Sequence, residues 1–330
     1  MQIYLLLNTS CNLTCPFCIR GKTSDNQLTK ELWKEALLKN DFSHTQLLLT
    51  GGEPTLHKNI IEIIELSRPY FQSISINTNG VKSDWIDRLK HRDIHVQISL
   101  DGIGHVHNQI RTSGQQDIFS SILKTVKKLE LYNISYNIST TVGTRNSNNI
   151  IDLMKFLPNF QKMKYWKVSP QLPFGCGDLM HCISVTEWNN LVDELLENAT
   201  IRLDIKRYFD FELLDRFISR KPALNPKMKV NCGDVRHKLY IYPDLTVYPC
   251  TCLTDFPLGN LREQLLSKII TSPASQRFTE YTVNPESCCA SCKYLSFCNG
   301  GCIGMSYHFF GKLGEGDYRC PLLRANRDSL

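Results

Sequence analysis

The sequence predicts an α/β fold in which a parallel sheet is followed by a small cysteine-rich region. Short apolar runs alternate with amphipathic segments six times before residue 185. Such alternation favours parallel strands joined by right-handed helical crossovers. From Cys232 onward the composition changes, and cysteines recur at short intervals. We therefore expect three parts, at residues 1–185, 186–231 and 232–330.

The strands and helices of the first part follow from hydrophobic periodicity. The clearest helix places Ile118, Ile122, Val126 and Leu129 on one stripe. The carboxyl ends of parallel strands are where we expect an active site. The predicted strands cover residues 3–7, 46–49, 73–77, 95–100, 135–142 and 165–169, and the predicted helices cover 30–38, 59–66, 85–90, 117–131 and 149–157.

The middle part, residues 186–231, is expected to form a bridge with helices at 186–198 and 211–219. Pro222 and Pro226 then interrupt the chain. Between residues 202 and 238 there are ten lysines and arginines against five acidic residues. This excess predicts either a solvated face or a contact surface for an acidic peptide, and no stacking motif accompanies it that would favour nucleic acid.

Composition limits the classes of protein to consider. Hydrophobic residues make up 42% of 330 residues, which is enough for a core. No apolar run reaches the roughly 18 residues of a membrane span, and no signal peptide precedes the first strand. We therefore expect a cytoplasmic protein. Because thiols stay reduced there, the 14 cysteines favour metal or cluster binding over disulfides.

Three of these cysteines, Cys11, Cys15 and Cys18, share one loop directly after the first predicted strand, with C-x3-C-x2-C spacing. Three thiolates can hold a [4Fe–4S] cluster and leave its fourth iron open to another ligand. Zinc is the alternative, but it normally takes four ligands, and no fourth cysteine or histidine lies at ligand spacing.

A second motif, Gly51-Gly52-Glu53-Pro54, directly follows the second predicted strand. Together the two motifs resemble those of the radical S-adenosylmethionine (SAM) enzymes. The resemblance implies a partial (β/α)6 TIM-like barrel, in agreement with the six strand–helix units. It also implies reductive cleavage of SAM to a 5′-deoxyadenosyl radical. An electron donor such as flavodoxin or ferredoxin would be a partner.

The same resemblance implies the residues that bind SAM. The carbonyls of the Gly51–Pro54 turn and the Glu53 carboxylate would face the ammonium of SAM. Asn79 would lie near the ribose, and Ser99 and Arg111 near the carboxylate, for which arginine is well suited. Asn79 could instead belong to an ordinary turn, and Arg111 to a surface ion pair. His105 and His107 are expected to be loop residues.

The cysteines of the last part resemble the SPASM extension of radical SAM enzymes, which holds auxiliary [4Fe–4S] clusters. A zinc ribbon is the alternative for Cys289 and Cys292. The resemblance implies two ligand sets. The terminal cluster would take Cys289, Cys292, Cys298 and Cys320, and the first auxiliary cluster would take Cys232, Cys250 and Cys302.

The fourth ligand of the first auxiliary cluster is left open. Sulfatase maturases carry a cysteine where this chain has Lys238, so either Cys252 substitutes or one iron is open. They also carry an acidic base where this chain has Thr251, and Leu245 stands where SPASM domains usually have glycine. Cys176, Cys182 and Cys288, and Cys252 if it is not a ligand, remain, and most of them are expected to be buried apolar side chains, unless one donates hydrogen as in peptide epimerases.

The resemblance as a whole predicts an oxidoreductase that abstracts hydrogen from a ribosomally made precursor peptide and forms a side-chain cross-link. Thioether formation and epimerisation are further options. Alternatives are sulfatase maturation, small-molecule dehydrogenation, and a non-catalytic iron–sulfur or zinc protein. The chain opens directly on its first strand, so we expect that leader recognition comes from a separate protein or from the later parts, or is absent. Neither nucleic acid nor membrane is an expected partner.

Overall fold

The computed structural model describes residues 1–21, 25–112, 116–220 and 234–327, and its centre is a single ten-stranded sheet. The strand order is β10-β9-β8-β1-β2-β3-β4-β5-β6-β7, and strands β1 to β8 pair in parallel. The strands are β1 Gln2–Leu6, β2 Gln46–Thr50, β3 Ser73–Thr78, β4 His95–Ser99, β5 Ser135–Val142, β6 Met163–Pro170, β7 Leu203–Asp204, β8 Lys238–Ile241, β9 Thr246–Tyr248 and β10 Gly259–Asn260.

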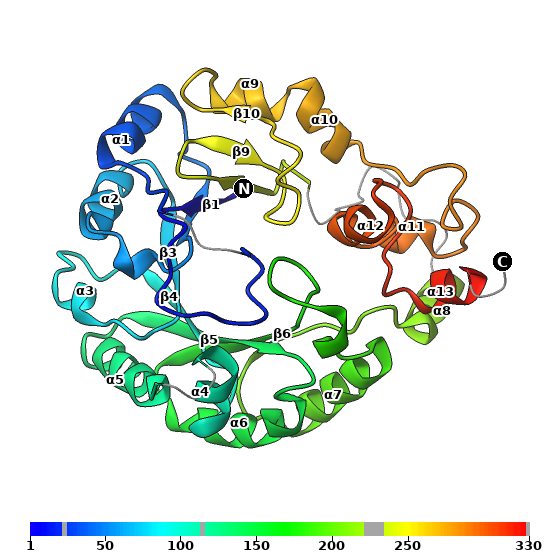
Figure 1. The fold of residues 1–330 in the computed structure, drawn as a ribbon, viewed down its shortest axis with the longest axis horizontal. Helices are drawn as coiled ribbons and strands as arrows, with labels where there is room; N and C mark the ends of the chain where they lie inside the picture. Colours follow the sequence, from blue (N-terminus) through cyan, green and yellow to red (C-terminus); the bar gives the residue numbers. More distant parts are fainter. Residues whose placement is uncertain (22–24, 113–115, 221–233, 328–330) are drawn as a thin grey trace.

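Helices cover the convex face of this sheet, which curves into a partial barrel (Figure 1). The predicted α/β class with a parallel sheet is therefore confirmed. The helices of the barrel are α1 Lys30–Lys39, α2 Ile60–Ser67, α3 Asp84–Asp87, α4 His105–Thr112, α5 Ile118–Leu131, α6 Ile150–Phe156 and α7 Val185–Asn198. Those that follow are α8 Phe211–Arg220, α9 Leu266–Ile270, α10 Pro273–Thr279, α11 Leu295–Cys298, α12 Ile303–Phe310 and α13 Pro321–Arg327.

Alternation along the strands separates the two faces of the sheet. In β1, Ile3 and Leu5 are fully buried against the helical layer, whereas Tyr4 between them is half-buried on the concave face. Local signals define the helix starts. The Thr29 hydroxyl accepts from Leu32 N–H at the start of α1, and Ser184 and Glu187 form a capping box at the start of α7.

The sheet extends beyond the six predicted strands at both edges. Strand β7, within the predicted bridge, pairs with β6 at one edge. Strand β8 of the cysteine-rich region pairs with β1 in parallel, so that Tyr4 lies opposite Tyr240. The cysteine-rich region is thus joined to the barrel by main-chain hydrogen bonds. The domain boundaries themselves stay a prediction.

Two details differ from the sequence-based expectation. The third predicted helix is shorter, at Asp84–Asp87. Residues His105 and His107, expected in a loop, belong to helix α4. Within the described residues, no helix is long and apolar enough to cross a membrane.

Candidate active site

The cysteine loop and the Gly51–Pro54 turn form one hydrogen-bonded unit. They follow the adjacent strands β1 and β2 at the same edge of the sheet. Gly52 N–H donates to the carbonyl of Asn8 at 2.9 Å, and Glu53 N–H donates to the carbonyl of Ser10 at 2.9 Å. A Cβ atom on Gly52 would lie 2.2 Å from the Ser10 carbonyl oxygen, so only glycine permits this approach.

The Glu53 carboxylate holds this unit to the end of β3. Its side chain is buried, and Oε1 accepts from Thr55 N–H at 3.1 Å and from the hydroxyls of Thr55 and Thr78 at 2.6 and 2.7 Å. Oε2 accepts from Asn79 N–H at 2.7 Å. Burial raises the pKa of Glu53, and these hydrogen bonds oppose the rise. Both oxygens are therefore engaged within the protein.

The three thiols of the loop are half-buried, and two of them, those of Cys11 and Cys15, meet N–H donors. Cys11 Sγ accepts from Leu13 N–H at 3.4 Å and lies 3.9 Å from Asn79 Nδ2. Cys15 Sγ lies 3.9 Å from Arg111 Nη1. Burial raises the pKa of Cys15 to about 11, against the effect of the Arg111 guanidinium. Donors aimed at sulfur stabilise cluster-bound thiolates, so this loop fits an iron–sulfur cluster.

Arg111 forms a buried ion pair, not a surface one. Its Nε donates to Asp101 Oδ2 at 2.6 Å, and the Asp101 side chain is fully buried. Asp101 Oδ1 also accepts from Thr141 N–H at 2.8 Å. This arrangement fixes the guanidinium beside Cys15. Sequence reasoning gave Asp101 no role, although it lies within the Ser99–Gly102 segment that ends the fourth strand.

His107 supports the same corner of the site. Its Nδ1 accepts from Asp101 N–H at 3.0 Å, which places the ring proton on Nε2. Burial and the nearby Arg111 lower the pKa of His107 to about 4, so the ring is neutral at physiological pH. Among the described residues its buried Nε2 has no hydrogen-bond partner.

Asn79 and Ser99 lie at the rim, one strand apart. Asn79 follows β3, and its Nδ2 donates to Asn12 Oδ1 at 2.9 Å, so it contacts the cysteine loop directly. Ser99 is the last residue of β4 and is paired with Ser139 of β5. The structure therefore brings Asn79, Ser99 and Arg111 to the edge of the barrel that carries the cysteine loop.

Four cysteines of the last region gather in one place: Cys289, Cys292, Cys298 and Cys320. Burial and then the neighbouring thiols of the other three raise the pKa of Cys289 to about 12. Gly316 packs directly against Cys289, because a Cβ at this position would lie 2.5 Å from Cys289 Sγ. This four-cysteine set fits the predicted terminal cluster.

Two further cysteines lie beside Gly304 in helix α12, and a third adjoins them. A Cβ on Gly304 would lie 3.3 Å from Cys252 Cβ and 3.7 Å from Cys302 Sγ. Cys252 N–H donates to Cys250 Sγ at 3.5 Å. Cys250, Cys252 and Cys302 are thus neighbours, as a shared cluster requires. Cys232, the remaining predicted ligand, lies outside the described residues.

A contact not expected from the sequence links the two cysteine-bearing loops. Arg20, two residues after Cys18, donates from Nη1 to the Thr251 hydroxyl at 2.6 Å. The Arg20 guanidinium also lies 5.9 Å from the centre of the Tyr240 ring. Thr251, between Cys250 and Cys252, is therefore tied to the loop of the first cluster.

The remaining cysteines are not the buried apolar side chains that we expected. Cys176 and Cys288 are exposed, and Cys182 is partly exposed. Cys176 N–H donates to the Cys18 carbonyl at 2.9 Å, which brings its loop to the first cluster loop. Leu245, at the usual glycine position, adopts a left-handed φ of 66° and is nevertheless buried.

The basic segment 202–238 is only partly described, since residues 221–233 lie outside the described ranges. Within it, Arg207 pairs with Asp193, and Arg236 pairs with Asp234 at 2.6 Å. Lys238 points elsewhere, with its Nζ 5.2 Å from the centre of the Tyr4 ring on the concave face. Part of the charge excess is therefore neutralised locally.

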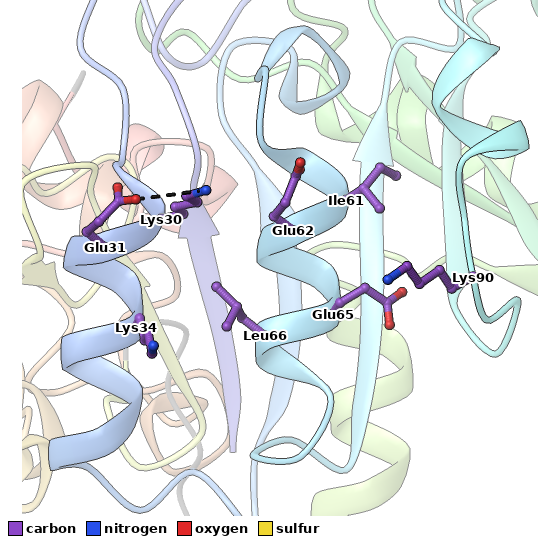
Figure 2. Close-up of a pocket in the computed structure, with 8 residues that line it drawn as sticks. All are labelled: Lys30, Glu31, Lys34, Ile61, Glu62, Glu65, Leu66 and Lys90. Atoms are coloured by element: carbon purple, nitrogen blue, oxygen red, sulfur yellow. Dashed lines mark ion pairs between the residues drawn. The ribbon is translucent and has the colours of Figure 1, made fainter.

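A groove of about 630 Å³ lies on the outside of the barrel, between α1 and α2 (Figure 2). Charged side chains line it, including Lys30, Glu31 and Lys34 from α1 and Glu62 and Glu65 from α2. It contains no residue of the cysteine loop or of the Gly51–Pro54 turn, so it is separate from the candidate site.

Comparisons with known proteins agree with this geometry. The radical SAM superfamily matches residues 5–157, and the SPASM iron–sulfur cluster-binding domain matches residues 232–293. A cysteine-type anaerobic sulfatase-maturating enzyme of Clostridium novyi (strain NT) is 26% identical over 89% of this chain and 85% of its own length. The sporulation killing factor maturation protein SkfB of Bacillus subtilis (strain 168) is 26% identical over 82% of this chain and 64% of its own length.

The solved structures share the fold. Streptococcus suis SuiB bound to its precursor peptide SuiA superimposes with a TM-score of 0.78, at 17% identity, over 98% of this chain and 75% of SuiB.

Proposed function

Since this chain is a radical SAM enzyme with a C-terminal SPASM domain, we propose that it modifies a ribosomally made precursor peptide, most simply by cross-linking side chains. The observation that supports this proposal most directly is the Arg20–Thr251 hydrogen bond, 2.6 Å long, which joins the SAM-cluster loop to the auxiliary region. A substrate at the first cluster would then also lie beside the second. The similarity to peptide-maturing relatives supports this, because it extends over both parts of the chain.

The residues of this chain would hold the reactants as follows. Cys11, Cys15 and Cys18 would ligate the cluster that binds SAM. When bound, the cluster and SAM supply a 5′-deoxyadenosyl radical that abstracts hydrogen from substrate. The backbone carbonyls of Gly51 and Gly52, which accept no hydrogen bond from other described residues, would receive the SAM ammonium. Glu53 and Pro54 would fix that turn.

Ser99, Asn79 and Arg111 would orient the rest of SAM. Arg111 donates from Nε to Asp101, so its Nη groups remain to bind the SAM carboxylate and to contact Cys15. The auxiliary ligands would be Cys289, Cys292, Cys298 and Cys320, with a second set of Cys232, Cys250, Cys252 and Cys302. Both auxiliary clusters would carry away the electron of a net oxidation. An electron donor such as flavodoxin or ferredoxin, and a separate leader-binding protein, are the further proposed partners.

A sulfatase-type maturase is the second candidate, favoured by the similarity to the Clostridium novyi enzyme. Thr251 argues against it. A threonine hydroxyl is far too weakly basic to replace a carboxylate, and this one accepts a hydrogen bond from Arg20.

The proposal is tested with peptides encoded by short reading frames beside this gene. Anaerobically reconstituted enzyme, SAM and a reductant are expected to remove a pair of hydrogens from one such peptide, seen by mass spectrometry as 5′-deoxyadenosine forms. A cysteine-containing sulfatase peptide serves as the comparison. Conversion of that peptide alone to formylglycine would replace our proposal with the second candidate.

A further inference from the structure

The strands of the barrel place two lysines on its concave face and a single carboxylate, Asp204, which is in register with Lys167. Strands β1 to β6 and β8 contain no aspartate or glutamate, and Asp204 of the short edge strand β7 is exposed. Lys167 of β6 and Lys238 of β8 both lie on this face, half-buried. Because low-dielectric walls focus the field of such charges, the interior favours an anionic ligand.

Lys167 lies at the height of the predicted SAM site. Register pairs Ser99 of β4 with Ser139 of β5, and Ser139 with Lys167 of β6. Neighbouring strands are about 4.8 Å apart, so Lys167 lies about 10 Å from Ser99 along one row. Its side chain can therefore reach the space beside the predicted SAM site.

The Lys167 ammonium has no partner among the described residues, since no acceptor there lies within hydrogen-bonding distance. The charges that act on it are Asp204, which favours the charged form, and Lys238 and Lys206, which oppose it. Burial is the largest influence, and it lowers the pKa of Lys167. A partly desolvated ammonium without an acceptor gains from any carboxylate that enters.

The other cations of this face are already engaged. Arg20 donates to Thr251, and Lys238 lies over the Tyr4 ring. Lys238 is paired with Gln2, and two residues closer to the rim Tyr4 stacks on Tyr240 with ring centres 4.7 Å apart, while His95 faces Tyr165 at 6.0 Å. These rings form a floor to the concave space, so a ligand that enters from the rim ends at the level of Lys167.

We infer that Lys167 binds a carboxylate of the substrate, an acidic side chain close to the residue that loses hydrogen. This inference rests on the proposed function and adds the chemical class of the peptide segment at the site. The carboxylate of SAM is the other possible source of the same chemistry, and the test separates the two.

The main test compares Lys167→Met with Lys127→Met, which removes the same charge from the exposed outer side of α5. The probes are the precursor peptide and versions with each Asp or Glu changed to Asn or Gln. A charge-assisted hydrogen bond contributes enough to weaken binding about 10- to 100-fold. Lys167→Met should raise the Kd of the acidic peptide by this factor and abolish its advantage over one amide version, while Lys127→Met changes neither.

Equal discrimination by Lys167→Met and the unmodified enzyme would overturn the inference. So would a loss of SAM affinity without a change in peptide discrimination, because it would assign Lys167 to the carboxylate of SAM. SAM affinity is measured by equilibrium dialysis without peptide.

A second measurement does not depend on peptide turnover. Acetic anhydride is used to label lysines of the reconstituted, SAM-bound enzyme, and the labelling of Lys167 and Lys127 is followed by mass spectrometry. N-acetylglutamate should protect Lys167 and leave Lys127 unprotected, whereas N-acetylglutamine should protect neither. Protection of Lys167 without turnover of any peptide would contradict the proposed function but support the carboxylate site. Absence of protection would contradict the carboxylate site.

Discussion

Replacing Cys11, Cys15 and Cys18 together by alanine is expected to remove about four irons per chain and to abolish 5′-deoxyadenosine formation. Their loop is hydrogen-bonded to the Gly51–Pro54 turn through the Asn8 and Ser10 carbonyls, so the loss of these thiols would remove the cluster beside that turn. Iron and sulfide analysis, with chromatography of the SAM products, measures both effects.

The matched control is Cys288→Ala, an exposed cysteine outside the proposed ligand sets. It should keep the iron content and the SAM cleavage of the unmodified enzyme. If the triple variant still cleaved SAM, the cysteine loop would not hold the SAM-binding cluster.

The second large effect is expected from Gly52→Ala. Its new Cβ would meet the Ser10 carbonyl oxygen at 2.2 Å and the carbonyl carbon at 2.6 Å, so the turn must move away from the cysteine loop. Overpacking of this kind costs about 1–3 kcal/mol of folding stability. Because a displacement of about 1 Å can cost about 100-fold in rate, we expect SAM cleavage to fall by that order.

Gly311→Ala is the control for this variant. Gly311 ends helix α12 with a φ of 66°, and a Cβ there meets no atom within 4 Å. It should cost about 1 kcal/mol from the left-handed backbone alone and leave SAM cleavage intact. Denaturant unfolding and SAM-cleavage rates distinguish the two variants, and normal cleavage by Gly52→Ala would show that the turn does not position SAM.

The strands and helices of the barrel could be predicted where one hydrophobic pattern extends along the whole segment. Strand β5 spans the predicted residues 135–142, because its β-branched and aromatic side chains alternate between two environments. Helix α4 was missed, because its sequence His-Val-His-Asn-Gln-Ile-Arg-Thr has only two apolar residues, Val106 and Ile110, to indicate a helical face. Tertiary contacts stabilise it instead, through the Asp101 contacts of His107 and Arg111.

Strand pairing between segments far apart in the sequence could not be predicted either. The alternation in β8 is only four residues long, and nothing local shows that it pairs with β1, more than 230 positions earlier. The two-residue strands β7 and β10 carry no pattern at all. For the same reason, sequence motifs could not predict the Arg20–Thr251 contact or the four donors around Glu53.

The motifs nevertheless identified the two families correctly. The radical SAM and SPASM assignments made from cysteine spacing and the Gly51–Pro54 turn are confirmed by the family matches. Motifs identify the residues that contact an invariant cofactor. Lys167, which we propose contacts the substrate, belongs to neither motif.

The central claim, hydrogen abstraction from a peptide, is tested most directly by the fate of the substrate hydrogen. The precursor peptide is prepared fully deuterated at carbon and incubated with reconstituted enzyme, SAM and reductant in ordinary water. We predict that deuterium from the peptide appears in 5′-deoxyadenosine as the modified peptide forms. Conversion of the peptide with unlabelled 5′-deoxyadenosine would contradict the claim.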